Sequence, residues 1–122
     1  MQAAEYGNDG IFRFLSEISQ DLSITDENDN NILHIIMRFN RSSEMLKCLD
    51  EDQLDDHVLN QQDSYYGETP LHVAAGENKH KSIDWLVSQG ADIYIRNFNG
   101  GLPGESRRSK RKTQRLLRDH RR

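Results

Sequence analysis

The chain has 122 residues, with 16 Lys and Arg against 20 Asp and Glu, and its formal net charge is −4. This length allows one domain and excludes a large multidomain enzyme. The single cysteine excludes an intramolecular disulfide framework, and no apolar run reaches the roughly 18 residues that a transmembrane helix needs. The first ten residues lack the basic side chains of a secretory signal. We therefore expect a soluble intracellular protein.

The charge is divided unevenly along the chain. Residues 1–104 carry 7 basic and 18 acidic side chains, a balance of −11, whereas residues 105–122 carry 9 basic and 2 acidic ones, a balance of +7. The sequence therefore predicts an acidic body followed by a basic tail, and the two parts require separate interpretations.

Residues 1–25 are predicted to contain a helix that begins after Asp9, a candidate N-cap. Its apolar side chains recur at helical spacing on one face. They are Ile11, Phe12, Phe14, Leu15, Ile18 and Leu22. The opposite face is acidic, which disfavours a membrane-surface helix, since such helices are rich in Lys and Arg. We interpret this segment as a capping helix or a degenerate repeat.

An internal repeat follows. The 33 residues that separate Gly67 from Gly100 also separate Pro70 from Pro103. A period of this length is typical of stacked repeat units. The pattern divides the chain into a lengthened first unit at residues 26–62, a second at 63–96 and the start of a third at 97–104.

The second unit has coherent local signals for two helices. Thr69 is a candidate N-cap, and Pro70 suits the first helical position. Asn78 can adopt the left-handed conformation that ends this helix. A second helix is expected near residues 80–88, and Gly90 suits the position after its end.

A hairpin-like loop is expected after the second helix. Residues 92–95 are interpreted as extended, and Asn99-Gly100 is a strong turn signal. The third copy then breaks, because Gly104 and Glu105 stand where Leu and His are expected.

The second unit resembles an ankyrin repeat. The matching residues are Gly67, Thr69-Pro70-Leu71-His72, Ala74-Ala75, Leu86-Val87 and Gly90-Ala91-Asp92. The resemblance implies an all-α fold, a short ankyrin-repeat solenoid of helix–turn–helix–hairpin units, and a protein-binding role.

Residues 26–103 also resemble the IκB branch of that family, through the segment 29–34, the lengthened first unit and the segment 95–100. The chain is similar to the truncated viral ankyrins (IκB-like proteins) of polydnaviruses, and it shows no phosphodegron before its repeats. This resemblance implies a viral protein that suppresses host immune signalling by binding a Rel/NF-κB factor. The expected location is the host cytoplasm, with the nucleus as a second compartment.

The histidines and the cysteine give no metal-site pattern. The resemblance implies that His34 and His72 have structural roles between neighbouring loops. The other three histidines show no ligand spacing with Cys48, which we expect to be packed within a helix.

Signals for catalysis are missing too. Ser42 and Ser43 are interpreted as helix N-caps, and no glycine-rich phosphate loop is present. We therefore predict a protein that is not an enzyme and has no catalytic residue, metal or cofactor.

The segment from Leu49 to Asn60 contains five acidic residues. It is interpreted as a solvated linker with a short helical turn, with an electrostatic patch for a basic partner as the alternative. No glycine-punctuated calcium loop supports metal binding there.

The basic tail, residues 105–122, contains a dense cluster that is a nuclear-localisation candidate. Its residues are Arg107, Arg108, Lys110, Arg111 and Lys112. A solvated disordered tail, a nuclear-import signal and nonspecific nucleic-acid contact remain open. No aromatic side chain is present for base stacking. Leu116-Leu117 could anchor a short helix against the last repeat.

Two functions follow from these observations. The first is an IκB-like inhibitor that covers the basic nuclear-localisation segment of a Rel/NF-κB factor. Its expected partner-binding residues are Asp26, Glu27, Asp29, Asn30, Tyr65, Tyr66, Asn97 and Phe98. The alternative is a generic ankyrin adaptor whose tail directs it to the nucleus or to nucleic acid. Because so few repeats share a core, we also expect marginal stability, or self-association through an uncovered apolar face of the last full repeat.

Overall fold

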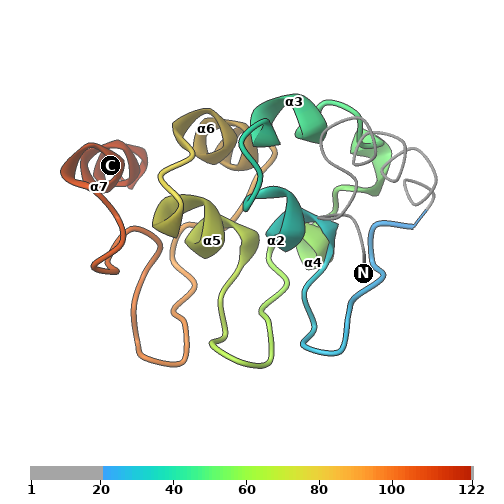
Figure 1. The fold of residues 1–122 in the computed structure, drawn as a ribbon, viewed down its shortest axis with the longest axis horizontal. Helices are drawn as coiled ribbons and strands as arrows, with labels where there is room; N and C mark the ends of the chain where they lie inside the picture. Colours follow the sequence, from blue (N-terminus) through green and yellow to red (C-terminus); the bar gives the residue numbers. More distant parts are fainter. Residues whose placement is uncertain (1–20, 122) are drawn as a thin grey trace.

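The computed structural model describes residues 21–121, which form two rows of short helices with three hairpin loops along one edge (Figure 1). The elements are α2 Ile32–Ile36, α3 Ser42–Leu46, the 3₁₀ helix η2 Glu51–Gln53, α4 Asp56–Leu59, α5 Pro70–Gly76, α6 His80–Ser88 and α7 Arg111–His120. No strand occurs within this part of the chain, and the all-α prediction is confirmed. The capping helix expected after Asp9 lies outside the described residues, apart from its last positions, where Leu22 is buried.

The two inner helices, α2 and α5, begin with the same device. The side chains of Asn31 and Thr69 accept the backbone N–H of the third helical residue, His34 or His72, and that histidine accepts the N–H of the cap in return. Such a reciprocal capping box satisfies two donors that a helix start otherwise leaves unpaired. It explains how helices of five and seven residues, below the length at which isolated helices are stable, have fixed first turns.

The second unit follows the expected pattern closely. Pro70 starts α5, Asn78 has a φ of 57°, α6 covers His80–Ser88 and Gly90 has a φ of 102°. The extended stretch predicted for residues 92–95 is wrong. It contains a turn instead, because the Asp92 carboxylate accepts the Tyr94 N–H at 2.8 Å.

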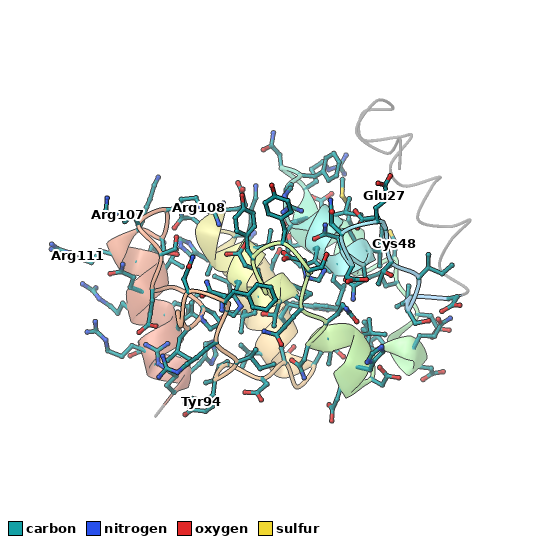
Figure 2. The ribbon with its side chains drawn as sticks, turned by 90° about the horizontal axis from the view of Figure 1, so that it is seen from below. Glu27, Cys48, Tyr94, Arg107, Arg108 and Arg111 are labelled. Atoms are coloured by element: carbon teal, nitrogen blue, oxygen red, sulfur yellow. The ribbon has the colours of Figure 1, made fainter. Side chains whose placement is uncertain are left out.

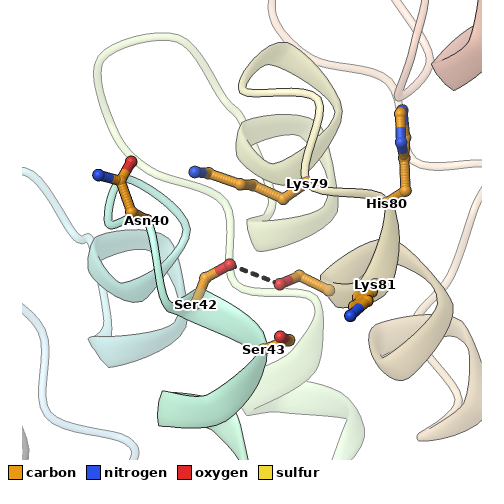
Figure 3. Close-up of a pocket in the computed structure, with 7 residues that line it drawn as sticks. Asn40, Ser42, Ser43, Lys79, His80 and Lys81 are labelled. Atoms are coloured by element: carbon orange, nitrogen blue, oxygen red, sulfur yellow. Dashed lines mark hydrogen bonds between the residues drawn. The ribbon is translucent and has the colours of Figure 1, made fainter.

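Two further expectations are corrected near α3. Arg41, not a serine, occupies the N-cap, and Ser42 is the first residue of the helix. The Ser42 hydroxyl lies 2.7 Å from that of Ser82, and both are buried, so this pair joins the starts of α3 and α6 (Figure 3). Cys48 is exposed rather than packed.

One apolar core runs through all three units. It includes Leu33, Met45, Leu71, Ile83, Leu86 and Leu117, each fully or almost fully buried. In α5, Ala74 and Ala75 are fully buried, and small side chains of this kind allow helices to approach closely. In α2, Ile36 and Met37 fill the corresponding space.

The third unit is built differently from the first two. Its outer helix, α7, lies in the row of α3 and α6 and packs against α6 (Figure 1), whereas turns replace the inner helix over residues 103–110. Leu117 is fully buried, so α7 covers the face that we expected to be open. The expectation of a disordered tail is therefore wrong for residues 105–121, which are folded against the second unit.

Polar contacts also hold this segment against the second unit. The Asn78 side-chain oxygen accepts the Lys110 N–H at 2.8 Å and the Thr113 hydroxyl at 2.7 Å. The buried Ser109 hydroxyl donates to the carbonyl of Ala75 at 2.9 Å. The first half of the basic tail is thus part of the folded solenoid.

Candidate protein-binding face

The three hairpin loops share one internal construction. Asp26, Asp63 and Asn97 each use a side-chain oxygen to accept backbone N–H groups from the loop that follows, at 2.6–3.0 Å. The first residue of each loop also donates its own N–H to the carbonyl at the far end of the loop. Each loop is therefore closed by its own first side chain and presents a defined tip.

Neighbouring loops are bonded to one another. The Ser64 N–H donates to the Asn28 carbonyl, and the Phe98 N–H donates to the Tyr66 carbonyl, both at 2.9 Å. These backbone bonds fix the spacing of the tips, so a partner would meet one continuous edge rather than three independent loops.

His34 and His72, which occupy the equivalent position in the first two units, add a second bond at each junction. In each ring, Nδ1 accepts the N–H of the helix cap, which leaves Nε2 to donate to the next loop: to Glu68 carbonyl at 2.8 Å or Gly101 carbonyl at 2.9 Å. Burial lowers the pKa of both rings, although the carbonyl contacts oppose it. The neutral rings therefore connect each helix start to the next loop by hydrogen bonds.

Exposed aromatic side chains gather on the second and third tips. Tyr65, Tyr66 and Phe98 have exposed fractions of 71%, 56% and 65%. The two tyrosine rings pack edge to face, with their ring centroids 5.0 Å apart. The Phe98 ring covers Gly67, where a Cβ atom would lie 2.3 Å from Phe98 Cδ1. Aromatic groups held in this way are typical anchors of protein interfaces.

The first tip is acidic. Glu27 and Asp29 are exposed, and Asp29 adopts a φ of 61° in the turn. Asp26 and Asn30 are half-buried and bonded to each other within the loop, as Asn97 is within its own. The structure thus places all eight expected partner-binding residues on the tips. Three of them, Asp26, Asn30 and Asn97, mainly make hydrogen bonds that shape the loops.

A groove of 330 Å³ lies beside the tips and was not expected from the sequence. It is lined by Arg38, Tyr66, Glu68, Asn97, Asn99, Ser106 and Arg108. Arg108 Nη2 lies 3.6 Å from Glu68 Oε2, and the Arg108 guanidinium also rests against Gly76 of α5. Figure 2, seen from the loop side, places Glu27 toward one end of the molecule and Arg107 and Arg108 toward the other. We call the three tips and this groove the hairpin face.

The nuclear-localisation candidates lie partly before α7 and partly within it. Arg107, Arg108 and Lys110 precede α7, whereas Arg111 and Lys112 belong to its first turn, and all five are exposed.

Across residues 21–121, no helix is long and apolar enough to cross a membrane, and no three His, Cys, Asp or Glu side chains gather as a metal site.

A family model for ankyrin repeats in three copies matches residues 1–97. The chain is 36% identical over 78 residues to the human transient receptor potential cation channel subfamily A member 1, and this match covers 64% of the chain and 7% of the channel. It is 33% identical over 82 residues to I-Kappa-B like protein I1 of Microplitis demolitor bracovirus, which covers 53% of the chain and 47% of that protein. The chain thus spans less than half of each of these relatives.

Proposed function

The chain belongs to the ankyrin-repeat family, and we propose that it acts as an IκB-like module that binds a Rel/NF-κB factor, masks its basic nuclear-localisation segment and so suppresses its signalling. Ankyrin repeats are usually non-catalytic protein-binding modules, since stacked units form extended binding surfaces. The likeness to an I-Kappa-B like viral protein supports the choice of partner.

The observation that carries the proposal is the juxtaposition of an acidic tip with an aromatic one. Glu27 and Asp29 attract cationic side chains, and Tyr65 and Tyr66 offer rings over which Lys or Arg can lie. A basic segment flanked by apolar residues would find both contacts on adjacent, mutually bonded loops.

The experiment measures binding of the purified chain to a Rel homology domain with its nuclear-localisation segment, by calorimetry at low and moderate salt. Glu27→Lys/Asp29→Lys should weaken binding about tenfold or more, since charge reversal replaces two attractions with repulsions. Glu77→Lys/Asp84→Lys reverses two exposed charges, at the end of α5 and within α6, outside the hairpin face, and is the matched control. Absence of binding at both salt concentrations would contradict the proposal.

A second candidate is a generic ankyrin adaptor whose tail directs it to the nucleus or to nucleic acid. The exposure of Arg107, Lys110, Arg111 and Lys112 favours it. Deleting the tail would unfold the third unit, so the test replaces these four residues with Gln in a tagged protein. Loss of nuclear enrichment supports this candidate, and an unchanged distribution contradicts it.

A further inference from the structure

We infer that the hairpin face binds one partner segment whose charge changes along its length, from basic at the first loop, through apolar at the aromatic tips, to acidic at the groove that contains Arg108. This inference rests on the proposed function and specifies the chemistry of its partner. It follows from three zones of different character along one rigid edge.

The first zone attracts cations. Residues 26–30 contain three carboxylates and no basic side chain, and Glu27 and Asp29 are exposed. Both oxygens of the Asp26 carboxylate accept hydrogen bonds within the turn, and its negative charge still adds to the local potential.

The middle zone is apolar. Tyr65, Tyr66 and Phe98 lie on adjacent loops, and the Phe98 N–H bond to Tyr66 holds the two loops together. An aliphatic or aromatic partner side chain would bury its surface here without the cost of separating charges.

The third zone reverses the sign of the first. The groove holds two cations, Arg38 from the first unit and Arg108 from the third, and one anion, Glu68. The side chain of Glu68 is only 13% exposed, whereas that of Arg108 is 57% exposed, so the groove presents its positive groups to a partner. Arg107, next in the chain, is exposed as well.

The Arg108–Glu68 contact leaves the exposed Arg108 guanidinium able to bind a second carboxylate. At 3.6 Å it exceeds the length of a charge-assisted hydrogen bond, which is about 2.7–2.9 Å. A partner carboxylate could therefore join Arg38 and Arg108 without displacing Glu68, whereas a partner cation would have to compete with Arg108 for that one carboxylate. The groove selects an acidic side chain.

These zones impose a direction. A uniformly basic segment is attracted by the first loop but repelled by the groove. A uniformly acidic segment is repelled by the first loop and attracted by the groove. Only a segment with separated basic and acidic ends matches both, so the order of its charges sets how the partner lies along the solenoid.

The experiment uses three fluorescein-labelled peptides and measures anisotropy at low salt. One has a Lys-rich end, a central Leu-Phe pair and a Glu-rich end, the second has the same composition with alternating charges, and the third replaces Glu by Gln. The separated-charge peptide should bind about fivefold tighter than either, since each exposed ion pair contributes up to about 1 kcal/mol. Equal affinities would overturn the inference.

The variants locate the effect. Arg38→Gln/Arg108→Gln should remove the preference for the Glu-rich end, whereas Arg111→Gln, an exposed charge of α7 outside the groove, should leave it unchanged. Persistence of the preference in the double variant would assign it to other residues and overturn the inference. Circular dichroism verifies that each variant remains folded.

A parallel measurement with the Rel homology domain separates the two proposals. If the domain binds and charge order has no effect on peptide affinity, the proposed function stands and this inference fails. If the domain does not bind while the separated-charge peptide retains its advantage, the partner assignment fails and the chemistry of the face stands.

Discussion

The second and third units begin with similar hairpins and diverge within four residues. In the second, Thr69 and His72 form a reciprocal capping box, and α5 follows. In the third, Glu105 accepts the Leu102 N–H at 2.6 Å much as His72 accepts that of Thr69. Leu102 has no side-chain oxygen to act as a cap, and its backbone carbonyl accepts the Glu105 N–H at 3.1 Å instead. Half of a capping box produces a turn rather than a helix here, and the chain continues to α7.

The third unit compensates through close packing. Gly104 has a φ of 90°, and a Cβ atom on it would lie 2.6 Å from Leu117 Cδ1, so the absence of a side chain lets α7 reach the core. The comparison shows that an outer helix can be retained without its inner helix when a glycine provides space and one leucine fills it.

The largest expected effect is that of Leu117→Ala, which tests whether the third unit belongs to the same cooperative structure as the second. Removing a fully buried leucine should lower the free energy of unfolding by about 2–5 kcal/mol, because lost burial and a residual cavity add. Urea unfolding followed by circular dichroism measures it. Leu116→Ala, at a half-exposed position, is the control, and equal effects of the two variants would show that α7 is peripheral.

The second prediction compares equivalent positions of the two loop–helix junctions. His72→Ala should cost roughly 1–3 kcal/mol, because it leaves the buried Thr69 N–H without its acceptor and removes one of the two hydrogen bonds to the Gly101 carbonyl. Glu105→Ala removes a similar bond at an exposed position, where water can replace it, and should cost less. Thermal unfolding of both variants measures the difference, and a larger loss for Glu105→Ala would reverse the comparison.

A third prediction separates backbone strain from steric conflict. Gly104→Ala and Gly90→Ala both place an alanine at positive φ, which costs about 1 kcal/mol. A Cβ at Gly90 meets nothing within 4 Å, whereas one at Gly104 meets Leu117. Gly104→Ala should therefore be the more destabilising by urea titration, and equal losses would mean that Leu117 can move aside.

The smallest expected effect is on the pH dependence of stability, through the buried histidines His34 and His72 of the first two units. Burial lowers the pKa of His34 and His72, so the unfolded chain binds protons more readily than the folded one. The stability contributed is fully present above the unfolded pKa of about 6.5 and is lost as pH falls through the lowered native values. Urea midpoints at successive pH values should decrease on acidification, and the His72→Gln variant should show a shallower decrease than the intact chain.

Local signals predicted the second unit well because each one acts within a few residues: Thr69 and Pro70 at a helix start, Asn78 and Gly90 at helix ends. The third unit was predicted only in part: Leu116-Leu117 indicated a short helix against the last repeat, as α7 is, but the contacts that hold this segment were not predicted. Its stability depends on contacts such as Asn78 with Thr113 and Ser109 with Ala75, which join residues more than 30 positions apart. The hairpin residues were found from the repeat, whereas the groove was missed because Arg108 belongs to a segment whose composition suggested a solvated tail.

The anchoring of α7 also has a consequence for the basic cluster itself. A receptor that reads residues 107–112 as an extended chain cannot do so while Arg111 and Lys112 form the first turn of a docked helix. Recognition of the cluster in an extended form would require local unfolding, so it would be linked thermodynamically to the free energy with which α7 docks through Leu117. The burial of Leu117, which completes the core, would therefore also limit access to the nuclear-localisation candidate.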